Sequence, residues 1–180
     1  MTEAFDLPIL LWLQEHFNSD ILNHLWNGIT FFGNKGWFWI ALAALLIIIP
    51  RTRYMGIPAA ISLVVTAGIN SVIIKNLIGR IRPFEYSDLI IPAVGELPDS
   101  SSFPSGHTSI SFAVALILLR ADKRIGIPAV IFASLIAVSR IFLRVHYPSD
   151  VIAGFLLAFA VSTIVWILWG LTPYAKKHMN

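Results

Sequence analysis

The run VIAGFLLAFAVSTIVWILWGLTPYA, residues 151–175, contains no Asp, Glu, Lys or Arg. Residues 54–74 and 100–119 lack charged side chains as well. A helix needs about 20 apolar residues to cross roughly 30 Å of hydrocarbon. Within a bilayer only helices and closed barrels satisfy every backbone polar group, and uninterrupted apolar runs of this length indicate helices. The three runs therefore predict an all-α, polytopic transmembrane helical bundle.

Two further uncharged runs, residues 36–50 and 125–139, are too short to cross a bilayer without extension. We extend the first run a few residues towards its start, and the second through Arg140 towards Arg144. The expected number of spans is about five or six, and the five that we place lie near residues 33–50, 56–78, 103–119, 126–144 and 149–171.

The N-terminal segment differs because polar and apolar side chains mix along it. Its apolar residues are Leu7, Leu10, Leu11, Leu13 and Phe17, and its polar ones include Asp6, Gln14, Glu15 and His16. This mixture predicts an amphipathic helix in the membrane interface, either a plain anchor or a guide for substrate. Residues 20–32 form a second interfacial helix or join the first span. We expect one membrane-embedded domain over residues 1–180, made of an interfacial segment (1–32), the bundle (33–171) and a cytoplasmic tail (172–180).

The composition excludes several classes of protein. Of the 180 residues, 57% are hydrophobic and 13% are charged, whereas about a quarter of a soluble domain is charged. The net charge of +3 is mild and the basic residues form no tract, so nucleic-acid binding is not expected. The chain has no cysteine, which excludes disulfides, thiolate metal sites and a cysteine nucleophile.

Charged and other polar side chains that could take part in catalysis or binding lie in three short segments, at residues 75–83, 104–107 and 139–150. Each segment lies at an end of a predicted span. Because successive spans alternate in direction, these three ends meet at the same membrane face. The sequence therefore predicts one polar site at that face.

Three cations of these segments, Lys75, Arg82 and Arg140, are expected to converge without matching acids. A charge at a span end usually faces the bundle interior or a polar cavity, because hydrocarbon disfavours it. The planar fork of arginine suits phosphate oxygens, so the cluster predicts an anionic ligand. For Lys35, Arg80 and Arg144 we expect the ordinary alternative, in which the side chain reaches out to the lipid headgroups. The alternative is that Arg80 and Arg144 assist headgroup binding.

The segment Pro104-Ser105-Gly106-His107 stands at a predicted helix start. Free backbone N–H groups and the helix dipole make such a start an anion site. The alternative is an ordinary cap formed by Ser105. His107, in the first turn, could give a proton to a leaving group or take one from water.

His146 and Asp150 are four residues apart, hence on one helical face. A carboxylate on one imidazole nitrogen fixes the tautomer and leaves the other nitrogen free to attack. The alternative is a helix cap formed by Ser149 or Asp150. A metal site made of His107, His146 and Asp150 is disfavoured, because the three nearby cations would repel a divalent ion.

The motifs Lys75-x6-Arg82-Pro83, Pro104-Ser105-Gly106-His107 and Ser139-Arg140-x5-His146-x3-Asp150 stand in this order along the chain. Together they resemble the three-part signature of the type 2 phosphatidic acid phosphatase (PAP2) superfamily, and the hydropathy layout is similar to that of its small bacterial integral membrane members. The resemblance implies a helical bundle with its active site near the outer leaflet. It also implies catalysis without a metal or other cofactor.

The resemblance implies a role for each site residue. His146 would be the nucleophile that forms a phosphohistidine, and Asp150 would orient it. His107 would protonate the departing lipid oxygen and then activate water. The phosphate oxygens would be held by Lys75, Arg82, Arg140, Ser105 and the backbone N–H of Gly106.

The orientation in the membrane depends on these roles. One face carries Arg51, Arg53, Arg120, Lys123, Arg124, Lys176 and Lys177, and the other carries Lys35, Lys75, Arg80, Arg82, Arg140 and Arg144. Seven against six decides nothing, but the count becomes seven against three once Lys75, Arg82 and Arg140 are assigned to the site. The excess of basic residues then places the C-terminus in the cytoplasm and the site outside the bacterial cytoplasmic membrane.

The expected function is that of a membrane lipid phosphatase whose partners are a lipid phosphate and the bilayer. Undecaprenyl diphosphate is the favoured substrate, and phosphatidylglycerol phosphate or phosphatidate is the alternative. A non-hydrolytic phospholipid transporter with the same cationic pocket is the rival from another class, although mere binding does not require the His–Asp pair. The segment between residues 80 and 103 is expected to be irregular, and a lid over the site is one role that it could have.

Overall fold

The computed structural model describes residues 3–178, which form helices joined by turns and loops, without a strand in that range. The predicted all-α fold is therefore confirmed. Residues 1–2 of the N-terminal segment and 179–180 of the tail lie outside the described residues. The elements are α1 (Glu3–Phe17), α2 (Asp20–Phe31), η1 (Asn34–Gly36), α3 (Trp37–Ile48), α4 (Arg53–Gly68), η2 (Ile69–Ile74), α5 (Lys75–Ile78), α6 (Pro83–Tyr86), α7 (Gly106–Ala121), α8 (Lys123–Phe142), α9 (Pro148–Gly170) and α10 (Pro173–His178).

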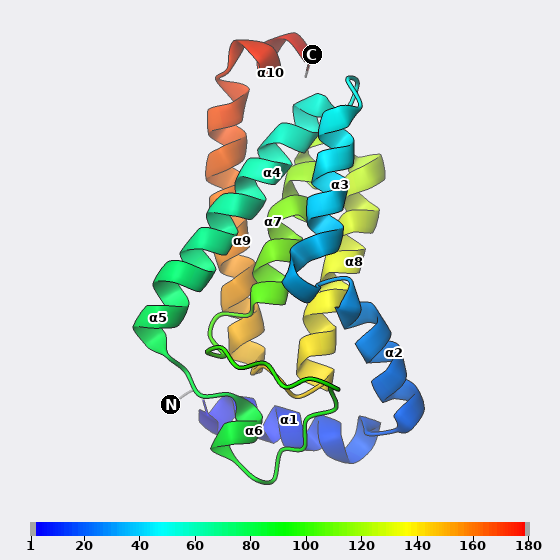
Figure 1. Cartoon of the computed structure of the whole chain (residues 1–180), viewed down its shortest axis with the longest axis vertical. Coiled ribbons are helices and arrows are strands. Elements are labelled where there is room, and N and C mark those ends of the chain that lie inside the picture. Colours follow the sequence, from blue (N-terminus) through cyan, green and yellow to red (C-terminus); the bar gives the residue numbers. More distant parts are fainter. Residues whose placement is uncertain (1–2, 179–180) are drawn as a thin grey trace.

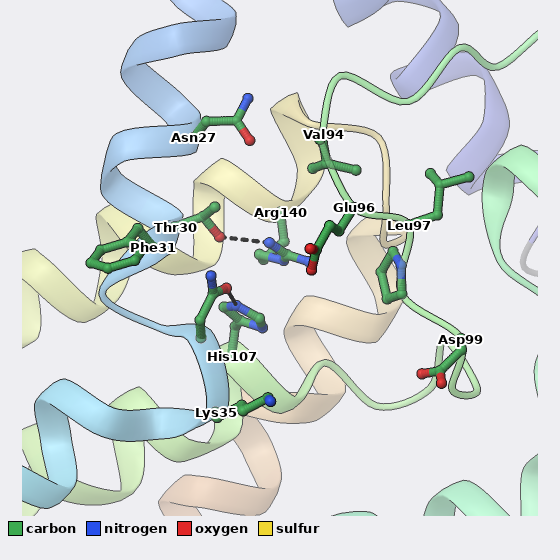
Figure 2. Close-up of a pocket in the computed structure, with 13 residues that line it drawn as sticks. Asn27, Thr30, Phe31, Lys35, Val94, Glu96, Leu97, Asp99, His107 and Arg140 are labelled. Carbon is green, nitrogen blue, oxygen red and sulfur yellow. Dashed lines mark hydrogen bonds between the residues drawn. The ribbon is translucent and has the colours of Figure 1, made fainter.

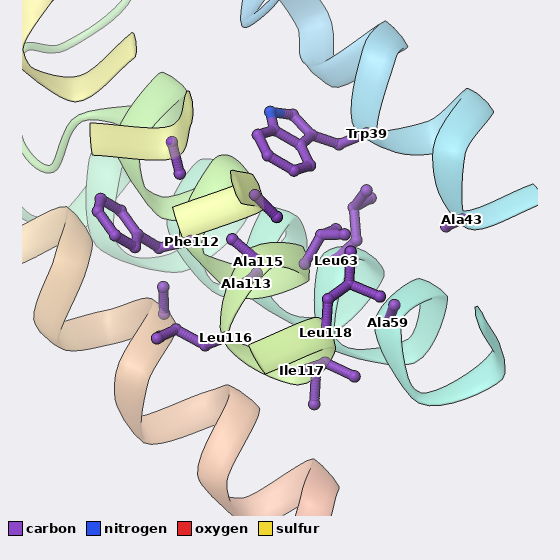
Figure 3. Packing of buried hydrophobic residues seen from close by; sticks show 14 of the residues in the cluster. Trp39, Ala43, Ala59, Leu63, Phe112, Ala113, Ala115, Leu116, Ile117 and Leu118 are labelled. Atoms are coloured by element: carbon purple, nitrogen blue, oxygen red, sulfur yellow. The ribbon is translucent and has the colours of Figure 1, made fainter. Parts of the chain in front are cut away.

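The bundle is built around α7, with α3, α4, α8 and α9 running beside it along the long axis (Figure 1). The middle of α7, from Phe112 to Leu118, is buried throughout. Its small residues let the neighbouring helices approach closely, and Trp39, Leu63 and Phe112 fill the space between them (Figure 3). The outer helices instead expose many Ile, Leu and Val side chains, as expected of a surface that faces lipid.

Four segments are long and apolar enough to cross a membrane: 20–48, 53–86, 123–142 and 148–170. Helix α7 is apolar as well, but it has only 16 residues. Each of the five predicted spans thus corresponds to an apolar helix, of which α7 is shorter than the other candidate spans, and the helix ends differ from the predicted bounds by a few residues. At the first span, residues 20–31 join α3 across η1, which is the second of the two alternatives for this segment. The chain bends there, because Lys35 and Gly36 adopt φ values of 50° and 70°.

The predicted N-terminal helix is present as α1, which lies across the end of the bundle where α8 and α9 are joined (Figure 1). Its residues Asp6 and Leu10 are completely buried. The interfacial position of α1 stays a prediction, but the helix also packs on the bundle.

The chain between α6 and α7, residues 87–105, is irregular and passes between α1, α2 and the bundle (Figure 1). It is fixed near its middle, where the Ala93 N–H donates to the Leu143 carbonyl and the Asn27 amide donates to the Ala93 carbonyl. The remainder, through Gly95 and Pro98, reaches the region of the predicted site.

Candidate active site

The three segments singled out in the sequence do meet at one end of the bundle. Hydrogen bonds join them directly: Arg82 Nη1 donates to the Val145 carbonyl at 2.7 Å, and the Ser105 N–H donates to the Asp150 carbonyl at 3.0 Å. Gly154 permits the second contact, since a Cβ atom there would lie 2.8 Å from the Ser105 carbonyl oxygen. The close packing of α9 on the start of α7 therefore needs a glycine at this position.

His146 and Asp150 are buried at the junction of α8 and α9. His146 Nδ1 lies 3.4 Å from Asp150 Oδ2, and the same oxygen accepts the Tyr147 N–H at 2.9 Å and the Ser102 hydroxyl. Asp150 thus caps α9 and faces the imidazole at once, so the two interpretations of this residue are compatible. Its carboxylate favours the tautomer with the proton on Nδ1, which leaves the lone pair on Nε2.

The other side of the imidazole faces a guanidinium. Arg82 Nη1 lies 3.5 Å from His146 Nε2, and Arg82 itself is held by the Ser100 carbonyl at 2.8 Å. The pKa of His146 is lowered to about 3, chiefly by burial; the bond to Asp150 opposes the shift, and the charges of Arg82 and Arg140 contribute to it. At neutral pH the imidazole is therefore uncharged and can act as a nucleophile or a base.

The predicted phosphate-binding cations surround this histidine. Lys75 Nζ donates to the Ser100 hydroxyl at 2.8 Å, and Arg140 Nη1 donates to the Thr30 hydroxyl at 2.6 Å. Within residues 3–178, Lys75, Arg82 and Arg140 form no ion pair with a carboxylate. Arg140 is 4% exposed and its Nε has no hydrogen-bond partner. A buried donor of this kind is costly, and an anionic oxygen would satisfy it.

His107 faces a cavity of about 700 Å³ that also reaches Arg140 (Figure 2). Its wall comes from the end of α2, from η1 and from residues 94–99. Asn34 Oδ1 lies 2.9 Å from His107 Nε2 and steadies the ring. The neighbouring Gly33 leaves room for that ring, since a Cβ atom there would lie 2.5 Å from its Cδ2.

Ser105 and Gly106 occupy the start of α7 as expected. The Ser105 side chain is the N-cap and accepts the Thr108 N–H, so the ordinary cap is realised. Gly106 has open space where a Cβ atom would stand. A ligand can therefore approach the backbone N–H groups of this first turn closely.

The expectation that Arg80 and Arg144 reach out to headgroups is wrong. Arg80 bridges two buried carboxylates, Asp6 and Asp150, at 2.8 and 2.6 Å. Arg144 is 1% exposed and donates to the Ile91 carbonyl and to Asn18 Oδ1. Both guanidiniums have acceptors that come from distant parts of the chain. Their burial is therefore less unfavourable than burial in hydrocarbon without acceptors.

Lys35 differs from these two arginines, because its side chain is exposed at the cavity wall. The sequence also gave no reason to select Thr30, Asn34, Ser100 or Ser102, which contact site residues. Across residues 3–178 there is no cluster of three His, Asp or Glu side chains that could hold a metal ion.

Residues 55–172 match the family model of the PAP2 superfamily. The chain belongs to that superfamily. It is 37% identical to an undecaprenyl-diphosphatase of Sulfolobus acidocaldarius over 76% of this chain and 67% of that protein. It is also 37% identical to a decaprenylphosphoryl-5-phosphoribose phosphatase of Mycobacterium tuberculosis, over 84% of this chain and 82% of that protein.

Solved PAP2 structures share the fold. The crystal structure of a transmembrane PAP2 type phosphatidylglycerolphosphate phosphatase from Bacillus subtilis superposes with a TM-score of 0.76, at 25% identity over 96% of this chain and 89% of that one. Aquifex aeolicus LpxE superposes with a TM-score of 0.78, at 22% identity over 90% and 94%. This PAP2 protein is thus a multi-pass membrane lipid phosphatase.

Proposed function

We propose that this PAP2 protein transfers the phosphoryl group of its lipid to His146. Nε2 of His146 attacks phosphorus, the bond from phosphorus to the leaving oxygen breaks, and that oxygen takes a proton from His107. Water then attacks the phosphohistidine, gives a proton to His107 and displaces the imidazole as phosphate forms. The observation that carries this proposal is the uncharged, buried imidazole held between Asp150 and Arg82.

The cations have a separate task in the proposed reaction. Lys75, Arg82 and Arg140 bind the phosphate oxygens together with Ser105 and the N–H of Gly106. Because charge develops on those oxygens in the transition state, fixed cations there lower the barrier. The free Nε of buried Arg140 supports this assignment.

For the substrate we propose undecaprenyl diphosphate. Two relatives at 37% identity carry names that refer to a polyprenyl diphosphate and a polyprenyl-linked sugar phosphate. Phosphatidylglycerol phosphate or phosphatidate is the alternative, favoured by the superposition on the Bacillus subtilis phosphatase. The polyprenyl substrates are preferred here because the corresponding sequences are more similar to this chain.

The proposed location is the bacterial cytoplasmic membrane, with the site on the extracytoplasmic side and the C-terminus in the cytoplasm. The site and the C-terminal helix α10 lie at opposite ends of the bundle (Figure 1). The turn between α3 and α4, with Arg51 and Arg53, lies at the same end as α10. The positive-inside rule then favours this orientation.

The test is phosphate release by the purified protein in detergent with EDTA present, on farnesyl diphosphate and short-chain phosphatidylglycerol phosphate in parallel. We expect release from both and a higher kcat/KM for the prenyl diphosphate. His146→Ala should lose at least about 10⁴-fold in kcat, because no other group replaces the nucleophile. Glu15→Gln, on the exposed face of α1, is the control for expression and purification, and its kcat should equal that of the wild type.

Three outcomes would contradict parts of the proposal. Turnover that survives in folded His146→Ala would rule out the nucleophile. A higher kcat/KM for phosphatidylglycerol phosphate would reverse the substrate assignment. Loss of wild-type activity in EDTA, restored by a divalent metal, would contradict the metal-independent reaction.

A further inference from the structure

Asp6 is a carboxylate with no exposed surface, and it lies in α1, outside the residues that match the family model. Its Oδ1 accepts the Ser149 N–H at 3.0 Å. Its Oδ2 accepts the Ser149 hydroxyl and, at 2.8 Å, Arg80 Nη2. Burying a carboxylate is unfavourable unless it is paired and hydrogen-bonded, and all three of these partners lie beside the active site. The position of Asp6 therefore calls for an explanation beyond anchoring α1.

Arg80 connects Asp6 to the centre of the site. Its Nη1 lies 2.6 Å from Asp150 Oδ1 and 2.7 Å from the Ser149 hydroxyl. Its guanidinium stacks on the ring of Tyr147, 3.8 Å from the centroid. A continuous series of contacts thus runs from Asp6 through Arg80 to Asp150 and on to His146 Nδ1.

The second connection is through the backbone. Ser149 is the second residue of α9, and its N–H has no acceptor within the helix at that position. Asp6 supplies this acceptor from another helix, while Asp150 caps the same turn at the Tyr147 N–H. Asp6 therefore holds both the backbone of the turn that carries Asp150 and the cation that binds the Asp150 side chain.

The charges explain why two carboxylates share one arginine. Arg80 occupies Asp150 Oδ1, whereas Oδ2 faces His146, Ser102 and the Tyr147 N–H. If Asp6 were neutral, the full charge of Arg80 would act on Asp150 and draw electron density away from Oδ2. The negative charge of Asp6 offsets part of the charge of Arg80 and so weakens the attraction between Arg80 and Asp150. Asp150 can then stabilise the imidazole of His146 as this ring becomes positive during phosphoryl transfer.

We infer that Asp6 is a positioning residue for phosphoryl transfer, which acts through Arg80 and the first turn of α9 on the carboxylate that orients His146. The inference rests on the proposed role of His146 as nucleophile. It makes α1 part of the catalytic unit, in addition to any contact that this helix has with the membrane surface. Residues near the N-terminus then set the geometry of residues more than 140 positions later in the chain.

The first experiment compares Asp6→Asn with Glu15→Gln, which changes a carboxylate to an amide on the exposed side of the same helix. The asparagine keeps an oxygen for the Ser149 N–H but removes the charge that faces Arg80. We expect kcat to fall about 10- to 100-fold with KM within twofold of the wild type, because Asp6 does not reach the substrate cavity. Equal kcat in Asp6→Asn and Glu15→Gln would overturn the inference.

The second experiment asks whether Asp6 acts through Arg80, by means of a double-mutant cycle with Arg80→Gln. Once Arg80 is neutral, removal of the Asp6 charge should have little further effect, so the double variant should have a kcat within about threefold of Arg80→Gln alone. Losses that multiply would overturn the route through Arg80. Thermal unfolding in detergent establishes that each variant is folded before its kinetics are compared.

If Asp6→Asn does not fold, Arg80→Lys carries the test instead. Lysine keeps the positive charge, but its single ammonium cannot bridge two carboxylates through separate nitrogens. A lower kcat at unchanged KM is expected, and wild-type kcat would overturn the inference. His146→Ala separates the two proposals: activity in that variant contradicts the nucleophile, whereas inactivity there combined with wild-type kcat in Asp6→Asn contradicts only the role of Asp6.

Discussion

The surroundings of the two site histidines differ sharply. His146 is 2% exposed and is enclosed by Asp150 on one side and Arg82 on the other. His107 is only partly buried, faces the cavity of about 700 Å³, and is steadied by Asn34. One histidine is thus fixed inside the protein, and the other lines an open cavity.

This difference suits two different chemical tasks. A nucleophile must be aligned with phosphorus and kept unprotonated, and a buried, bonded ring beside cations meets both needs. A group that passes protons to a leaving group and takes them from water must reach both, which requires an open position. The comparison therefore divides the site into a rigid inner half around His146 and an accessible outer half around His107.

Among the variants that test this division of the site, the largest fall in kcat is expected for His107→Gln. On a lipid phosphate monoester, kcat should fall by about 10²- to 10⁴-fold, because the departing alkoxide then lacks its proton donor. On a prenyl diphosphate the loss should be clearly smaller, because the departing group is a phosphate and needs less protonation. Parallel kinetics on the two substrates measure the difference. Equal losses on both would place the main contribution of His107 in the activation of water, which is the same step for the two substrates.

The inner half was largely predictable from the sequence, and the reason is local spacing. His146 and Asp150 are one helical turn apart, and the alternation of spans brings the Lys75, Arg82 and Arg140 segments to one face. These relations depend only on helix period and span direction.

The partners of His107 in the outer half and the support of the inner half were not predictable, because they depend on contacts over long separations. His107 and Asn34 are 73 positions apart, Arg80 and Asp6 are 74 apart, and Arg140 and Thr30 are 110 apart. The prediction for Arg80 failed for this reason, since its partners Asp6 and Asp150 lie 74 and 70 positions away in the sequence. One local signal existed: Asp6 lines up with Leu10 and Leu13 at helical spacing, and an acid on an apolar face indicates a buried charge.

A smaller effect on kcat is expected for Gly33→Ala, which changes the packing of the outer half of the site against the bundle. In Gly33→Ala the new Cβ would lie 2.5 Å from the His107 ring and 2.8 Å from Ile136. The backbone at Gly33 has φ of −88°, which alanine accepts, so the conflict is purely steric. We expect kcat to fall about tenfold as the ring is displaced, and the free energy of unfolding to fall by about 1–3 kcal/mol.

Gly28→Ala is the matched control for this steric prediction, because a Cβ atom at Gly28 in α2 meets nothing within 4 Å. It should keep wild-type kcat and gain roughly 0.5–1 kcal/mol from better helix propensity. If Gly33→Ala and Gly28→Ala have the same kcat, the close fit of the His107 ring is not important for turnover.

The last prediction tests the burial of the inner histidine through the dependence of stability on pH. Burial lowers the pKa of His146 from 6.5 to about 3, so between these values the unfolded chain binds a proton that the folded protein does not. The resulting contribution to stability is fully present above pH 6.5 and is lost progressively as the pH falls towards 3. Between pH 7 and 5 this amounts to about 2 kcal/mol.

Thermal unfolding in detergent at pH 7 and pH 5 measures this loss, with His146→Gln as the comparison. Glutamine does not titrate, while His16 and His24 at the surface remain in both proteins. The wild type should therefore lose more stability on acidification than His146→Gln does. Equal losses in the two proteins would mean that His146 titrates in the folded state as it does in the unfolded chain, and the inner half of the site would then be as accessible to protons as the outer half.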